Sequence, residues 1–103
     1  DRTQWQRMLK NEIVKGIDLL DKKEEMLTYL SSDLRKYECS DTNITEITYP
    51  VNEYPTKVKS LSFDKLAEIE GVLWGIKGQY LLFDDGYVIN IRRHSGYYIS
   101  LEI

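Results

Sequence analysis

Apolar and polar residues alternate most regularly in the last third of the chain, residues 71–103. Three apolar-rich runs are separated there by Asp85-Gly86 and by His94-Ser95-Gly96. Asp-Gly between two such runs is a strong local signal for a β-hairpin, because a tight hairpin turn needs positive φ at its central residues. The pattern therefore predicts an antiparallel meander that carries most of the core.

The turn lengths predict which residues share a face of this meander. A two-residue turn at Asp85-Gly86 places Gln79 opposite Arg92, and a three-residue second loop with a left-handed Gly96 keeps one face continuously apolar. The predicted core combines that face with apolar positions of the first half: Trp5, Leu9, Leu27, Leu30, Tyr80, Leu82, Ile89, Ile91, Ile99 and Leu101.

Helical periodicity dominates the start of the chain. An apolar stripe that begins at Trp5 predicts a helix near residues 4–15. A second helix is expected after Asp18 or Asp21, because either side chain can accept hydrogen bonds from the first turn. Ser31-Ser32-Asp33 predicts a break or a new cap in that second helix.

The middle of the chain has strand character at residues 44–49 and 56–63, while Pro50 and Pro55 confine the segment between them to an edge or a connector. We therefore expect a single α+β domain, helical over about 1–38 and β over about 44–103. Its two amino-terminal helices pack on an antiparallel meander of five or six strands that can curl toward a small barrel.

Composition and charge limit the kinds of protein to which this sequence can belong. The 103 residues carry a net charge of −3, and residues 1–55 account for all of the acid excess, so any anion site must be local. No apolar run reaches membrane-spanning length, and the lone Cys39 cannot form an internal disulfide, which favours a cytoplasmic protein. The chain begins at Asp1 rather than Met, and we expect a carboxy-terminal fragment of a longer protein.

Polar side chains gather on the second face of the predicted meander. An amide, a guanidinium and a phenol fixed on a rigid sheet can bind a phosphate or a carboxylate, or recognise the edge of a base. The alternative is that this is the solvated face of a half-buried sheet. The candidate binding residues on this face are Gln79, Asn90, Arg92, Tyr98 and Ser100, with Lys77, Arg93 and His94 at its rim.

Motifs of catalysis and of metal binding are absent from the sequence. His94 is the only histidine, so a multi-histidine metal site cannot be built, and a catalytic triad would need its turn neighbour Ser95. Gly75-Ile76-Lys77-Gly78 has the spelling of a KH-module loop, but strand-like runs flank it, so it predicts a bulge or a sheet corner from which Lys77 projects. We expect no catalytic residues, no cofactor and no metal in this fragment.

Several short motifs resemble one uncharacterised family, domain of unknown function 2797. They are Asp1-Arg2-Thr3-x-Trp5 with Met8-Leu9-Lys10, Gly75-Ile-Lys-Gly-Gln-Tyr-Leu81, Asp85-Gly86, and Asn90-Ile-Arg-x-His-Ser-Gly-Tyr97. The chain looks like the carboxy-terminal part of such a protein. Longer members carry cysteine pairs and a segment similar to GIY-YIG nucleases upstream, so the resemblance implies that any metal binding or cleavage belongs to an upstream domain.

Two functions remain open from the sequence. One is a non-catalytic module that binds an anionic partner, with nucleic acid as a candidate, beside an upstream domain of the same protein. The alternative is a structural or oligomerising domain without a ligand of its own; the oligomeric state is open. On the first hypothesis, Arg92→Ala should weaken binding by roughly 1–3 kcal/mol and leave stability within about 0.5 kcal/mol.

Overall fold

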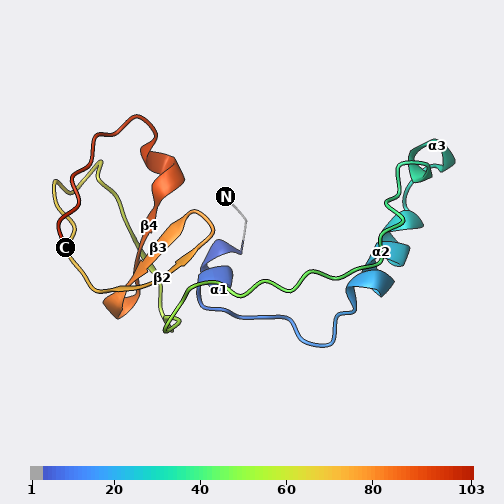
Figure 1. The fold of residues 1–103 in the computed structure, drawn as a ribbon, viewed down its shortest axis with the longest axis horizontal. Coiled ribbons are helices and arrows are strands. Elements are labelled where there is room, and N and C mark those ends of the chain that lie inside the picture. The colour runs from blue at the N-terminus through green and yellow to red at the C-terminus, as the bar shows by residue number, and fades with distance from the viewer. Residues whose placement is uncertain (1–3) are drawn as a thin grey trace. The chain divides into compact units, whose positions relative to one another are not determined.

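A computed structural model describes residues 4–103 and has an α+β fold, which confirms the predicted class. The helices are α1 (Trp5–Leu9), α2 (Leu19–Leu27) and α3 (Ser32–Arg35). The strands are β1 (Lys59–Leu61), β2 (Leu73–Lys77), β3 (Tyr80–Phe83) and β4 (Tyr87–Asn90), the last three of which are labelled in Figure 1. Two 3₁₀ helices follow β3 and β4: η1 (Asp84–Gly86) and η2 (Ile91–His94).

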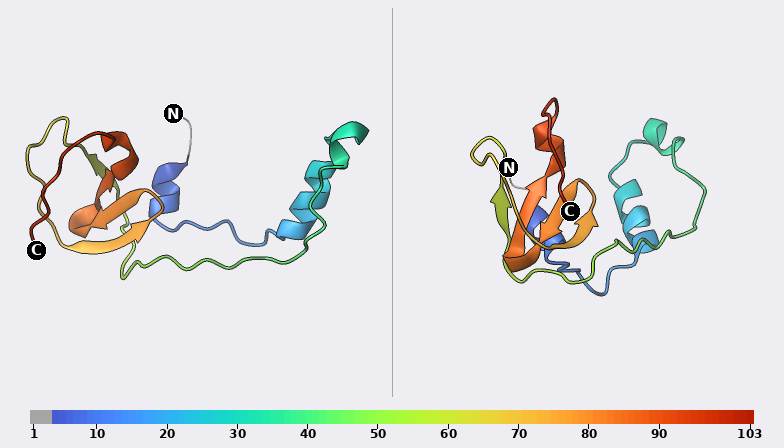
Figure 2. Two further views of the ribbon diagram at one scale, coloured as in Figure 1. Left: turned by 45° about the horizontal axis from the view of Figure 1, so that its top comes forward. Right: turned by 60° about the vertical axis from the view of Figure 1, so that its left-hand side comes forward.

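The described strands form one mixed sheet in the order β1-β4-β3-β2. β2, β3 and β4 make an antiparallel meander, whereas β1 lies parallel to β4 (Figure 2). β2 and β3 both lie in the first apolar run of the predicted meander and β4 lies in the second, but the third run, residues 97–103, forms no strand. The sheet is open, so it does not close into a barrel. Residues 44–49 are not a strand in the structure, although their sequence predicted one.

The chain divides into two compact units. One takes in the chain up to Ile13 together with Thr48–Ile103, and the other is Val14–Ile47. The first unit contains the sheet and α1, and the second contains α2 and α3.

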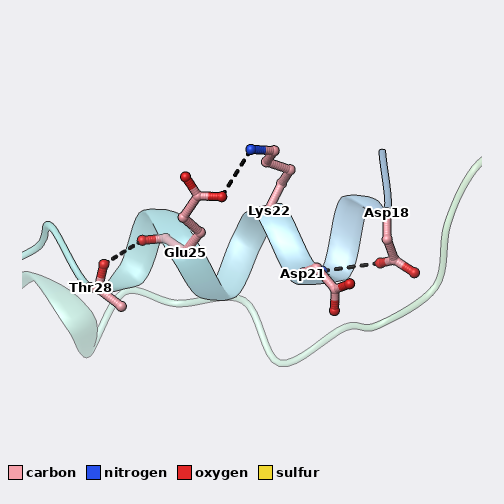
Figure 3. A network of polar contacts seen from close by, with 5 residues as sticks. All are labelled: Asp18, Asp21, Lys22, Glu25 and Thr28. Carbon is pink, nitrogen blue, oxygen red and sulfur yellow. Dashed lines mark hydrogen bonds and ion pairs between the residues drawn. The ribbon is translucent and has the colours of Figure 1, made fainter. Parts of the chain in front are cut away.

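The second unit, Val14–Ile47, owes its longest helix to local hydrogen bonds. The Asp18 carboxylate accepts from the backbone N–H groups of Leu20 (2.9 Å) and Asp21 (3.1 Å), which confirms Asp18 as the cap of α2. Lys22 and Glu25 form an ion pair one turn further on (Figure 3). No side chain of α2 or α3 is buried, and Leu30, between the two helices, is exposed, so the prediction that Leu27 and Leu30 belong to the core was wrong.

Helix α1 is shorter than its periodicity predicted, because Asn11 adopts the left-handed conformation with φ of 58°. The Asn11 N–H donates to the Met8 carbonyl, and the Glu12 N–H donates to the Arg7 carbonyl. This pair of bonds is a Schellman motif, which satisfies the last carbonyls of a helix and turns the chain away. The predicted end of this helix, near residue 15, therefore lies well beyond the observed one.

The hydrophobic core lies between α1 and one face of the sheet. Leu9, Leu82 and Val88 are fully buried, and Trp5, Val51, Val58 and Tyr80 pack against them. Leu9, Leu82 and Ile89 are predicted core residues that the structure confirms as buried. The predicted core omitted Val88, because the assumed strand register put it on the opposite face.

The register of the β3–β4 hairpin differs by one residue from the prediction. Tyr80 pairs with Asn90, and Leu82 pairs with Val88. The cause is Asp84: its backbone N–H donates to the Val72 carbonyl and its carboxylate accepts from the Val72 N–H. Asp84 thus extends the pairing with the β2 side, and the loop to β4 has three residues instead of two.

The chain after β4 forms a 3₁₀ helix and then irregular structure, where the sequence predicted one continuous hairpin. The His94 ring hydrogen-bonds the Asn90 carbonyl (2.9 Å), which curls the chain into η2. Gly96 has the expected positive φ, 82°, but no third meander strand follows. Three predicted core residues are therefore exposed: Ile91, Ile99 (50 % exposed) and Leu101 (84 % exposed).

Gly75 marks a sheet irregularity, as its sequence context predicted. The β2–β3 register shifts between Leu73 and Gly75, and Gly75 forms an isolated bridge with Val51. A Cβ atom on Gly75 would lie 2.5 Å from the Val51 Cα, so only glycine allows this approach. Among the described helices, none is long and apolar enough to cross a membrane.

Candidate functional site

One face of the sheet carries both the core and a group of polar side chains. Because directly paired residues share a face, Ser60, Val88 and Leu82 lie in one row across β1, β4 and β3. Asn90 and Tyr80 form the neighbouring row. The first row is apolar at its centre, whereas the second offers an amide and a phenol.

Trp5 of α1 lies against this polar row. Its ring is parallel to the Tyr80 ring, with an interplanar angle of 0° and ring centroids 5.8 Å apart. This offset stack leaves part of both rings accessible, since Trp5 and Tyr80 are only half-buried. The core packing of Leu9, one helical turn away, holds α1 in this position.

The stack forms one wall of a pocket with a volume of about 300 Å³. Its lining residues carry two aromatic rings, one amide, two hydroxyls and one guanidinium, contributed by Trp5, Ser60, Tyr80, Asn90 and Arg93. None of these residues is acidic. The pocket thus combines surfaces for stacking with groups that can donate hydrogen bonds to an anion.

The orientation of the Asn90 amide follows from its neighbours. Its Oδ1 accepts a hydrogen bond of 2.9 Å from the Gln79 side chain, and its Nδ2 is 3.4 Å from the Tyr80 hydroxyl. The carbonyl oxygen thus accepts from Gln79, and the N–H₂ group donates to Tyr80. Gln79 and Asn90, both predicted site residues, are brought together in this way.

Arg93 contributes the positive charge of the pocket. It is exposed on η2, and no carboxylate among residues 4–103 forms an ion pair with it. An exposed guanidinium that forms no ion pair within the described residues can make bidentate hydrogen bonds to a phosphate or carboxylate. Arg92, its neighbour on η2, is exposed but does not line the pocket.

His94 is buried, contrary to the prediction that it lies at an exposed rim. Its Nε2 accepts from the Phe63 N–H (3.1 Å), and its Nδ1 donates to the Asn90 carbonyl. These partners require a neutral ring with the proton on Nδ1. His94 therefore fixes η2 against the end of β1 and positions Arg93, instead of binding a ligand itself.

Lys77 is also buried, at 8 % exposure, although the sequence predicted that it projects from the sheet. Its Nζ donates to the Met8 carbonyl (2.9 Å) and lies over the rings of Tyr49 (5.1 Å) and Tyr54 (5.0 Å). Burial lowers the pKa of the Lys77 ammonium below its usual value of 10.5. The side chain is used within the fold and is not available to a ligand.

The predicted polar face does not exist as one surface. Gln79 lies in the turn between β2 and β3, Arg92 lies on η2, and Tyr98 and Ser100 lie in irregular chain beyond it. The Gln79 carbonyl accepts from the Ile91 N–H, so the predicted pairing of Gln79 with Arg92 was wrong. Of the predicted residues, Asn90 and Arg93 line the pocket.

Trp5, Ser60 and Tyr80 line the pocket but were not predicted as site residues. Trp5 and Tyr80 fit the apolar pattern of core positions, and that pattern cannot show that their rings stay partly accessible. Ser60 reaches the site only through the parallel pairing of β1 with β4. Within residues 4–103 there is no group of His, Cys, Asp and Glu side chains that could hold a metal ion.

Comparison with known proteins gives a family but no described relative. No curated protein and no solved structure matches the chain. A family model described as "Protein of unknown function (DUF2797)" matches residues 1–99 of the 103. This match spans α1, all four strands and every residue that lines the pocket. The chain therefore belongs to the DUF2797 family.

Proposed function

We propose that this domain is a non-catalytic module that binds an anionic partner, and that single-stranded nucleic acid is that partner. The observation that carries the proposal is the pocket between α1 and the sheet, in which Arg93 and the Asn90 amide stand beside the Trp5–Tyr80 stack. No carboxylate lines it. An anion therefore meets donors there, and a base meets two aromatic rings.

The size of the pocket supports a ligand group no larger than one base or one phosphate. Its volume of about 300 Å³ is at the lower end of the range typical of ligand sites. Stacking of one base on an aromatic side chain is worth about 1–3 kcal/mol, and it tolerates any base because every base has a π-face. Binding should therefore depend weakly on sequence.

The charge of the chain supports a local interaction. With a net charge of −3, the protein as a whole repels a polyanion, so any attraction must be local, as at the surface around Arg93. We expect a shallow salt dependence, with a slope of log K against log salt of about −0.7 for each phosphate contacted on a single strand.

The test compares two neighbouring arginines. A fluorescently labelled single-stranded oligonucleotide is titrated at low salt with the wild type, with Arg93→Ala and with Arg92→Ala as the matched control. Arg93→Ala should weaken binding by roughly 1–3 kcal/mol, the scale of a charge-assisted hydrogen bond, whereas Arg92→Ala should have little effect. Equal losses in both variants, or no binding by the wild type, would refute the proposal.

A structural or oligomerising role is the second candidate, favoured by one observation. The irregular segment after η2 exposes large apolar side chains, including Tyr98, Leu101 and Ile103. Apolar residues gathered on a surface often mark protein interfaces. A mass that rises with protein concentration in sedimentation equilibrium, without affinity for the oligonucleotide, would support this role in place of the first.

A further inference from the structure

Lys77 connects parts of the first unit that are far apart in the sequence. It stands at the end of β2, and its ammonium contacts the Met8 carbonyl, the Asn11 side chain (3.4 Å) and the rings of Tyr49 and Tyr54. No carboxylate among residues 4–103 forms an ion pair with it. Carbonyl oxygens and aromatic faces therefore offset only part of the cost of its burial.

These contacts lie where the chain leaves the first unit and where it returns. The chain passes into the second unit after Ile13 and comes back at Thr48. Asn11 stands two residues before the first crossing, and Tyr49 stands one residue after the second. The segment before the second unit and the segment after it are thus both in contact with the Lys77 Nζ atom.

We propose that Lys77 closes a neck formed by the outgoing segment, residues 8–11, and the returning segment, residues 49–54. The second unit, Val14–Ile47, is then an insertion, and the two segments of the first unit that flank it in the sequence are held together by one side chain. The neck also holds the carboxyl end of α1, whose other end carries Trp5. The proposal does not depend on whether the pocket binds an anion.

Replacement of Lys77 by methionine should loosen both segments of the neck, residues 8–11 and residues 49–54, at the same time. Methionine keeps most of the apolar stem but has no ammonium to hold Met8, Asn11 and the tyrosine rings. In the full chain, hydrogen exchange at the Asn11 amide, bonded to the Met8 carbonyl, and at the Asn52 amide, bonded to the Trp74 carbonyl, should each accelerate at least about tenfold. The Ile91 amide, bonded to the Gln79 carbonyl, should keep its protection.

Lys59→Met is the matched control. The Lys59 ammonium also lies over a tyrosine ring, that of Tyr87 at 5.7 Å, but Lys59 is exposed and lies on β1, outside both segments of the neck. This variant should leave the Asn11 and Asn52 amides unchanged. Acceleration at only one of the two amides in Lys77→Met, or at neither, would overturn the proposal.

If Lys77→Met also loses protection at the Ile91 amide, the variant has unfolded globally and does not test the neck. In that case a measurement on the wild type tests the proposal. The two tyrosine rings should shift the ε-methylene protons of Lys77 upfield in the NMR spectrum, relative to those of the exposed Lys65. Equal shifts for the two lysines would show that the rings do not enclose Lys77, and the neck would then be excluded.

Discussion

His94 stands where three segments of the first unit meet. Its ring nitrogens bind the Phe63 N–H, just after β1, and the Asn90 carbonyl, at the end of β4. The rings of Phe63 and Tyr97 contact it in edge-on geometry, with centroid distances of 5.3 and 5.2 Å. The imidazole thus supplies both polar and apolar contacts at the base of η2.

The first prediction concerns the loss of these polar contacts. His94→Phe keeps a ring of similar shape but leaves the Phe63 N–H and the Asn90 carbonyl without partners in a half-buried site. We expect it to lower the free energy of unfolding in urea by about 2–4 kcal/mol, since each unsatisfied buried group costs about 1–3 kcal/mol. Arg92→Ala, on the same 3₁₀ helix, should change it by no more than about 0.5 kcal/mol.

The second prediction follows from the lowered pKa of Lys77. The groups that face its ammonium are the Met8 carbonyl, Asn11 and the rings of Tyr49 and Tyr54. As pH rises toward 10.5, the folded protein releases the Lys77 proton before the unfolded chain does. The unfolded state then binds more protons, so the contribution of Lys77 to stability increases with pH.

Urea unfolding of the wild type and of Lys77→Met between about pH 8 and about pH 10 measures this contribution. The difference in unfolding free energy, wild type minus variant, should increase across that range because the folded wild type releases the Lys77 proton. The other titrating groups are shared by both proteins and largely cancel in the difference. A difference that decreases with pH would show that the site stabilises the charged lysine instead.

At the scale of elements, the third prediction uses two glycines with nearly the same positive φ. Gly86 in η1 has φ of 79°, and Gly96 has φ of 82°. A Cβ atom on Gly86 would lie 1.9 Å from the Lys57 carbonyl oxygen, whereas one on Gly96 would meet no atom within 4 Å. Gly96→Ala should therefore cost only the left-handed backbone, about 1–2 kcal/mol.

Gly86→Ala should cost at least a further 1–3 kcal/mol, roughly the penalty for overpacking. The difference between the two variants in thermal or urea unfolding isolates the contact of η1 with the segment before β1. Equal losses would mean that the Lys57 segment moves aside without cost.

The sequence predicted elements whose signals are local. The Asp18 cap, the break at Ser31 and the hairpin of β3 and β4 all follow from residues within a few positions of each other. The register failed at Asp84 because its partner, Val72, lies on the β2 side and competes with the turn signal of Asp85-Gly86. A turn motif fixes a hairpin only when no third segment binds the residues beside it.

At the scale of the whole molecule, the candidate site also contains residues that local sequence signals predicted and residues that they did not. Asn90 and Arg93 were predicted, because polar residues beside an apolar strand stand out in the sequence. Trp5 and Ser60 were not, because they reach the pocket through contacts between segments far apart in the chain. Pairing of β1 with β4 leaves no periodic signal in either strand.

The sheet order also predicts the sequence of folding events, which gives the fourth prediction. β2, β3 and β4 are joined by tight turns, whereas β1 is separated from its partner β4 by all of β2 and β3. Closing long loops costs entropy, so the meander should form before β1 docks. Leu61→Ala on β1 should accelerate unfolding and leave the folding rate within about twofold, whereas Leu82→Ala on β3 should slow folding.

Stopped-flow measurements of both rates against urea separate these outcomes. If Leu61→Ala slows folding as much as Leu82→Ala does, β1 is already paired in the transition state and the order is wrong. A late β1 has a consequence for the pocket, since Ser60 arrives with that strand. The pocket is then completed in the last step of folding and lost in the first step of unfolding. A ligand that bridges Ser60 and Arg93 will therefore lengthen the lifetime of the native state without changing how fast the chain folds.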